Sequence, residues 1–133
     1  MPGQIRVPIN SDADTVTARQ QGRALAAQLG LSSGDQALVA TAISELARNI
    51  VEYAQRGEII LELAERGNRR GVVVIARDEG PGIPDIERAM QDGFTTGHGL
   101  GLGLPGARRL MDEFEIVSVV GKGTTVIVKK WAR

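Results

Sequence analysis

The hydrophobic period of this sequence changes at Gly57, and the change separates a helical part from a strand-rich part. Before Gly57, apolar residues recur at helical spacing, most regularly over residues 35–54. After it, residues 58–63 and 72–76 have the short apolar character of strands and predict a hairpin around the polar loop 65–70. Helices followed by strands predict an α+β fold, with one layer of helices on one mostly antiparallel sheet.

The helix over residues 35–54 is the best-defined predicted element. Its broad apolar face consists of Leu38, Val39, Ala42, Ile43, Leu46, Ala47 and Ile50. Ser33, with Gln36 three residues on, fits a capping box at its start. An earlier helix is predicted between the capping residues Ser11 and Asp12 and the terminating Gly30, after a short strand over residues 4–9.

The remaining predicted elements lie in the second half of the chain. Residues 84–91 predict a short helix, and residues 104–114 a further helix with Pro105 in its first turn. Residues 115–120 and 124–131 predict a closing hairpin through a glycine-containing turn.

Length and charge limit the classes of protein to consider. The chain has 133 residues, which predicts a single domain over residues 1–133. Its 16 basic and 16 acidic side chains give a formal net charge of zero. Proteins that bind nucleic acid mainly by displacing counterions need a basic surface, so we expect no nucleic-acid partner.

Composition also excludes several chemistries. Cysteine is absent, which excludes disulfides, thiolate zinc sites and cysteine nucleophiles. His98 is the single histidine, so a metal hydrolase or a Ser-His-Asp enzyme has few candidate residues. The start of the chain has no signal-peptide core, and no apolar run approaches the ~20 residues of a membrane-spanning helix. We therefore expect a cytoplasmic protein without a membrane partner.

Glu45 and Asn49 form the first candidate site. They lie four positions apart and therefore share one face of the predicted helix, at the border of its apolar stripe. An Asn oxygen is a hard ligand that suits Mg²⁺ beside phosphates, and a neighbouring Glu can accept a proton from an attacking hydroxyl. The same pair of residue types is also common on ordinary solvated helices.

Eight of the 17 glycines lie between Asp78 and Gly106, and two further candidate sites fall there. Asp78 follows an apolar strand, where its carboxylate could accept a hydrogen bond from an exocyclic amino group such as that of adenine. Gly80 would let a flat base approach the backbone, and Gly82 supplies a φ angle that other residues avoid. The same residues also make a good turn.

The other glycine-rich site precedes a predicted helix. Gly99, Gly101 and Gly103 allow successive N–H groups to face inward, and a helix N-terminus adds positive potential, which suits a polyphosphate. A flexible hinge has the same composition. A dinucleotide fingerprint is excluded, because no strand precedes these glycines and no βαβ unit surrounds them. The fourth segment, residues 121–125, contains Thr124 and is by itself typical of a hairpin turn.

The order of these four segments resembles the N, G1, G2 and G3 boxes of the GHKL (Bergerat-fold) nucleotide-binding family. Within that family, residues 41–49, 78–85, 92–96 and 104–114 are similar to the switch serine/threonine kinases of stressosomes. The likeness extends over nearly the whole chain. It implies a two-layer α/β sandwich, with helices on one face of a mostly antiparallel mixed sheet.

The resemblance also implies roles for single residues. Asn49 would hold Mg²⁺, Glu45 would be the catalytic base or would orient water, and Asp78 would accept the adenine amine. The other nucleotide-binding residues would be Gly80 and Gly82 around the base, Gly99, Gly101 and Gly103 at the phosphates, and Thr124 behind Asp78.

One position departs from the family. Related kinases often carry a basic residue where this chain has Gly97. The cation that faces the γ-phosphate is therefore open, with Arg108, Arg109 and Lys122 as candidates.

The implied function is phosphoryl transfer from Mg-ATP to serine or threonine of STAS-domain scaffold or antagonist proteins. After release, the kinase would activate a downstream PP2C-type phosphatase or another output protein. The alternative is a nucleotide-dependent anti-sigma or partner-sequestering module with little or no kinase activity. The two interpretations differ in whether the partner becomes phosphorylated.

Overall fold

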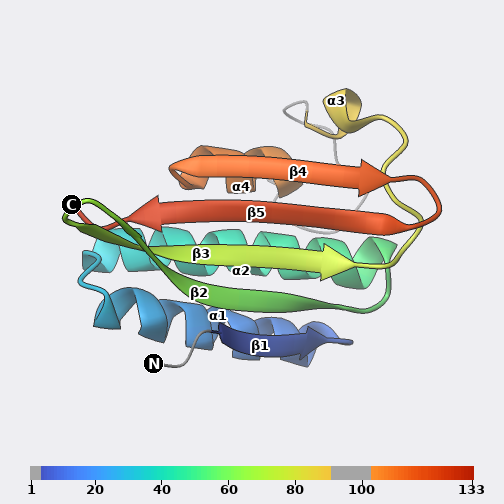
Figure 1. The fold of residues 1–133 in the computed structure, drawn as a ribbon. Coiled ribbons are helices and arrows are strands. Elements are labelled where there is room, and N and C mark those ends of the chain that lie inside the picture. Colours follow the sequence, from blue (N-terminus) through green and yellow to red (C-terminus); the bar gives the residue numbers. More distant parts are fainter. Residues whose placement is uncertain (1–3, 91–102) are drawn as a thin grey trace.

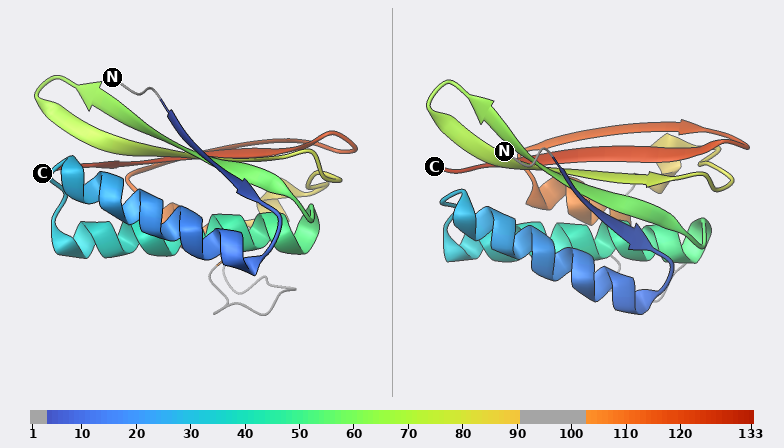
Figure 2. Two further views of the ribbon diagram at one scale, coloured as in Figure 1. Left: turned by 90° about the horizontal axis from the view of Figure 1, so that it is seen from below. Right: turned by 60° about the horizontal axis from the view of Figure 1, so that its bottom comes forward.

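The computed structural model describes residues 4–90 and 103–133, which form a five-stranded sheet with helices packed against one face (Figures 1 and 2). The strands are β1 (Gln4–Ile9), β2 (Gly57–Arg66), β3 (Arg69–Asp78), β4 (Glu113–Val119) and β5 (Gly123–Trp131). Their order in the sheet is β1-β2-β3-β5-β4, and each of these neighbouring pairs is antiparallel. The predicted layer of helices on an antiparallel sheet is confirmed.

Helix α1 (Asp12–Gln28) begins and ends where the sequence predicts. Ser11 is its N-cap residue, and the carboxylate of Asp14 in the first turn accepts the Ser11 N–H at 3.2 Å. Gly30 follows the helix with a φ of 86°, a left-handed conformation that favours glycine.

Helix α2 (Ser33–Tyr53) begins two residues before the predicted start. The prediction of Ser33 as its cap is wrong by one position: Ser32 is the N-cap, and its hydroxyl accepts the Asp35 N–H at 3.1 Å. The predicted partner Gln36 instead donates its side-chain amide to the Leu31 carbonyl at 3.0 Å. Adjacent serines offer the same capping chemistry, so sequence alone does not decide between them.

The strands of the first hairpin are longer than predicted. β2 and β3 pair from Gly57 with Asp78 to Arg66 with Arg69, so the predicted loop over residues 65–70 shortens to Gly67 and Asn68. Gly67 supports the tight connection with a φ of 60°.

The third helix and the closing hairpin also differ from their predicted boundaries. α3 (Ile86–Ala89) is shorter than predicted, and Gln91 lies outside the described residues. α4 (Gly103–Leu110) ends before Phe114, so the prediction that Phe114 is helical is wrong. Phe114 belongs to β4, where it pairs with Val128 and packs against the core. The pairing with β5 thus overrides the local helical pattern.

The core lies between the sheet and the two long helices. Apolar residues of α2 face alternate residues of the central strands, and nearly all are fully buried: Val39, Ala42, Ile43, Leu46, Ala47, Ile50, Ile59, Leu61, Val72, Val74, Val126 and Val128. This packing fixes the C-terminal end of α2 against the end of the sheet at which β3 finishes and β5 begins. Among the described helices, none has the length and apolar character needed to cross a membrane.

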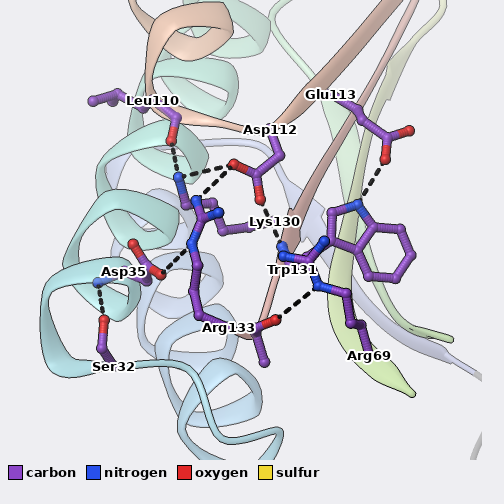
Figure 3. A network of polar contacts seen from close by, with 10 residues as sticks. Ser32, Asp35, Arg69, Leu110, Asp112, Glu113, Lys130, Trp131 and Arg133 are labelled. Atoms are coloured by element: carbon purple, nitrogen blue, oxygen red, sulfur yellow. Dashed lines mark hydrogen bonds and ion pairs between the residues drawn. The ribbon is translucent and has the colours of Figure 1, made fainter. Parts of the chain in front are cut away.

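A group of side chains at the opposite end, the C-terminal polar cluster, consists of Asp112, Glu113, Lys130, Trp131 and Arg133 (Figure 3). The buried Lys130 Nζ donates to the Leu110 carbonyl at 2.9 Å and lies 3.4 Å from Asp112. The same Asp112 carboxylate accepts the Trp131 N–H at 2.9 Å. These contacts attach the last residue of α4 to β5.

The two carboxylates of the C-terminal polar cluster titrate below their ordinary range. Burial by itself would raise the pKa of Asp112, but the Trp131 N–H and the charges of Lys130 and Arg133 outweigh it and lower this pKa. The hydrogen bond from the Trp131 indole, together with Arg66, lowers the pKa of Glu113. Both groups therefore stay charged and paired near neutral pH.

Candidate active site

Asp78 is the last residue of β3, and the sheet register places it between Gly57 of β2 and Thr124 of β5. Its Oδ1 accepts the Gly80 N–H at 2.9 Å and the Thr124 N–H at 3.3 Å. Within residues 4–90 and 103–133, both of these hydrogen bonds go to Oδ1 and none reaches Oδ2. The carboxylate is thus held through one oxygen, and the other is available to accept from a ligand.

The turn after Asp78 packs closely against two other elements. A Cβ at Gly80 would lie 2.6 Å from the Cβ of Ala54 at the end of α2. Gly82 has a φ of 79°, and a Cβ there would lie 2.5 Å from the Val119 carbonyl oxygen. Gly80 is therefore required by packing, and Gly82 by both packing and backbone conformation, independently of any ligand. The turn after Asp78 is therefore held in a fixed position against the end of α2 and the end of β4.

Thr124 lies beside Asp78, to which it donates its N–H, and it also belongs to a network that was not predicted. Its buried hydroxyl lies 2.8 Å from the hydroxyl of Ser118 in β4. Ser118 Oγ in turn accepts the Ile83 N–H at 2.7 Å, which ties the turn to the closing hairpin. Ser118 lies on the same, core-facing side of β4 as Phe114 and Ile116. A serine at this alternating spacing was the signal in the sequence that could have revealed the network.

Glu45 and Asn49 lie one turn apart on α2, as predicted. Glu45 is buried, with an exposed fraction of 6%, whereas Asn49 is half-buried. The two carboxylate oxygens of Glu45 have different partners: Oε2 accepts from Arg48 Nη1 at 2.6 Å, and Oε1 accepts the Gly103 N–H at 3.0 Å. Arg48 is a residue that the sequence reasoning missed, although an i,i+3 pair of opposite charges was a visible signal.

Gly103 is the first residue of α4 and has a φ of 49°. Its N–H, which the sequence predicted as a phosphate donor, is directed at Glu45. The other predicted phosphate donors, Gly99 and Gly101, lie outside the described residues, as do Gly97 and His98.

The three cation candidates do not lie at the start of α4. Arg108 and Arg109 are exposed in the last turn of the helix, away from Gly103. Lys122 is exposed in the turn between β4 and β5. The basic side chain that the structure brings next to Glu45 is Arg48.

The candidate residues lie along the C-terminal half of α2 and at the adjoining end of β3. Gly80 packs against Ala54 at the end of α2, and Asn49 and Glu45 precede Ala54 by about one and a half and two and a half turns of that helix. Among the described residues, no three His, Asp or Glu side chains form a metal-holding group.

The sequence matches the family described as histidine kinase-like ATPase domain over residues 9–130. The serine/threonine-protein kinase RsbT of Bacillus subtilis (strain 168) is 54% identical over 134 residues, with 100% of each chain covered. An anti-sigma F factor of Thermoanaerobacter sp. (strain X514) is 38% identical over 120 residues, covering 86% of this chain and 82% of that protein.

Solved structures with a similar fold include two histidine kinase domains. The mycobacterial sensor histidine kinase MprB superposes with a TM-score of 0.56 at 17% identity, covering 97% of this chain and 99% of that one. The catalytic domain of the histidine kinase ThkA gives a TM-score of 0.53 at 16% identity, covering 95% of each chain. The predicted GHKL fold is confirmed by these likenesses, which at such identities concern the fold alone.

Proposed function

This chain belongs to the histidine kinase-like ATPase domain family, and on that premise we propose that it transfers the γ-phosphate of Mg-ATP to serine or threonine of STAS-domain proteins. It is an ATP-dependent serine/threonine kinase of the GHKL type, related over its full length to a curated kinase of that kind. The STAS-domain substrates, the use of Mg²⁺ and the roles of single residues are proposals.

The observation that carries the nucleotide assignment is the geometry of Asp78. Two backbone N–H groups orient its carboxylate through Oδ1. Oδ2 can then accept the exocyclic amine of adenine, whereas guanine carries a carbonyl at that position and would meet the carboxylate with a second acceptor. Thr124 and Ser118 hold the backbone around this acceptor in place.

Asn49 fits a magnesium role. Mg²⁺ usually keeps several waters and is held by few protein oxygens together with substrate phosphates. Asn49 supplies one half-buried amide oxygen on α2, one turn after Glu45. When bound, the ion would neutralise charge on the phosphates.

In the proposed transfer, Glu45 accepts the proton of the attacking hydroxyl. The hydroxyl oxygen of the substrate Ser or Thr forms a bond to the γ-phosphorus as the bond from that phosphorus to the bridging oxygen of ADP breaks. ADP leaves with the electron pair of that bond, and the hydroxyl proton moves to the Glu45 carboxylate. Such a reaction depends mainly on positioning and charge stabilisation, so a small domain can perform it when the partner supplies the hydroxyl.

The proposed partners follow from the similarity to the serine/threonine-protein kinase RsbT. The unphosphorylated STAS scaffold would hold the kinase, and phosphorylation would release it to activate a PP2C-type phosphatase or another output protein. A second candidate function is supported by the 38% identity to an anti-sigma F factor. In that case the chain would bind and sequester its partner in a nucleotide-dependent way, with little or no phosphorylation.

One experiment separates the two functions. The chain is mixed with Mg-ATP and a candidate STAS partner, and the partner is analysed for phosphoserine and phosphothreonine by mass spectrometry. We expect an addition of one phosphate that depends on Mg²⁺ and is lost in Glu45→Gln. A nucleotide-dependent complex in which the partner stays unmodified would contradict the kinase proposal and favour the sequestering module.

A further inference from the structure

The carboxylate of Glu45 is bound in the way that proteins commonly bind a phosphate group. A guanidinium, from Arg48, contacts one oxygen at 2.6 Å. The backbone N–H of Gly103, at the N-terminus of the eight-residue helix α4, contacts the other at 3.0 Å. Guanidinium groups and N–H groups at helix N-termini are both strong donors to phosphate oxygens.

From this convergence, and resting on the proposed function, we infer that Arg48 is the cation for the γ-phosphate and that the Glu45 carboxylate competes with this phosphate for Arg48 and the Gly103 N–H. The competition links the binding of the γ-phosphate to the release of Glu45 from its two partners. When the terminal phosphate takes the two donors, Glu45 loses both partners and becomes able to accept a proton from the substrate hydroxyl.

The burial of the groups supports this exchange. Glu45 has an exposed fraction of 6%, so its charge needs partners that solvent does not replace. The side chain of Arg48 is 37% exposed and can change its partner by rotation without disturbing the core. An anion that enters beside Arg48 therefore meets a mobile cation and a fixed carboxylate.

The position of Arg48 also distinguishes it from the other candidate cations. Arg108 and Arg109 lie in the last turn of α4, at the opposite end from Gly103. Arg48 precedes the proposed Mg²⁺ ligand Asn49 by one residue. Adjacent helix residues point in different directions, so it is the ion pair with Glu45, the proposed base, that places Arg48 at the reaction centre.

The test compares affinities for ATP and ADP, because only ATP carries the γ-phosphate. Dissociation constants are measured by isothermal titration calorimetry with Mg²⁺ for the unaltered chain, Arg48→Gln and Glu45→Gln. Arg23→Ala, an exposed arginine on α1, is the matched control. We expect Arg48→Gln to weaken ATP at least about tenfold and ADP by less than about threefold. We expect Glu45→Gln to tighten ATP about fivefold, because a competing charge is removed, and to leave ADP nearly unchanged.

Other results would contradict the inference. If Arg48→Gln weakens ATP and ADP to the same extent, or if Glu45→Gln weakens ATP, the inference is wrong even when the unaltered chain phosphorylates its partner. If the unaltered chain binds no ATP, the proposed function and this inference fail together. Should Glu45→Gln not fold, as judged by circular dichroism, the ratio of ATP to ADP affinity in Arg48→Gln decides the matter alone.

Discussion

Asp78 and Thr124 are register partners on β3 and β5, and the Thr124 N–H donates to the Asp78 carboxylate at 3.3 Å across 46 positions of sequence. The contact fixes the carboxylate at the end of the sheet. It also determines which oxygen faces away from the protein backbone, and several expected outcomes depend on that orientation.

Replacement of Asp78 by Asn should abolish tight ATP binding while leaving the fold intact. The Asn carbonyl oxygen can still accept from Gly80 and Thr124, but an amide donor then replaces the acceptor that faces the adenine amine. The Asn side-chain amide and the adenine amine would then face each other as two donors. This opposition, together with the loss of the carboxylate charge, should lower the affinity for ATP at least about 100-fold. Calorimetric titration with ATP measures this change. Wild-type affinity in the variant would refute the adenine assignment.

Asn49→Ala should lower phosphoryl transfer at least about 100-fold, because the proposed protein ligand for Mg²⁺ is removed. Asn49→Asp retains an oxygen ligand and should retain more activity. Initial rates of partner phosphorylation over a range of Mg²⁺ concentrations test both variants. Thr41→Ala, an exposed substitution on the same helix, is the control. Equal rates in Asn49→Ala and the control would exclude Asn49 from the reaction.

Gly82→Ala should destabilise the protein more than Gly121→Ala. Both glycines have positive φ angles, of 79° and 83°, so both variants carry the same backbone strain of about 1 kcal/mol. At Gly82 the new Cβ also meets the Val119 carbonyl, whereas at Gly121 no atom lies within 4 Å. We expect a further loss of about 2 kcal/mol at Gly82. Urea unfolding of the two variants gives the difference, and equal midpoints would contradict the close approach.

Ser118→Ala should weaken both the fold and ATP binding, because the Ile83 N–H and the Thr124 hydroxyl lose a partner. The cost in unfolding free energy should be about 1–2 kcal/mol. Ser44→Ala is a matched control, since the Ser44 hydroxyl donates to the Ala40 carbonyl of its own helix. Thermal unfolding and ATP titration are measured on both. If the two variants behave alike, the Ser118 network does not support the site.

The C-terminal polar cluster should make stability depend on pH in the acidic range. The pKa of Asp112 is lower in the folded chain than its ordinary value near 4, so the folded state binds this proton less readily than the unfolded state. The contribution is therefore full above about pH 5 and is lost as pH falls through the folded pKa. Asp112→Asn should reduce stability at pH 7 by about 1 kcal/mol and have a smaller effect near pH 3. Urea unfolding at both pH values checks this. A loss of stability in Asp112→Asn that is larger near pH 3 than at pH 7 would contradict the prediction.

The order and type of the elements were predictable because they depend on local pattern. The 3.6-residue period of α2, the period of two in the core-facing strands and the glycines at the turns act over a few residues at a time. Asp78 at a strand end and the Glu45–Asn49 pair on one helix face could be read from spacing for the same reason. The errors were also local in origin: Ser32 and Ser33 are equivalent caps, and Phe114 follows a helical pattern.

The sequence by itself thus determined the helices, the strands and the spacing of the candidate residues along them. Only the tertiary structure decided which of these residues meet. The pairing of β4 with β5 takes Phe114 out of the helix and brings Ser118 to Thr124. The packing of α4 against α2 brings the Gly103 N–H to Glu45 across 58 positions, beside Arg48. The physical reason is that a buried carboxylate must find donors, and the fold, rather than the neighbouring sequence, determines which donors are near enough.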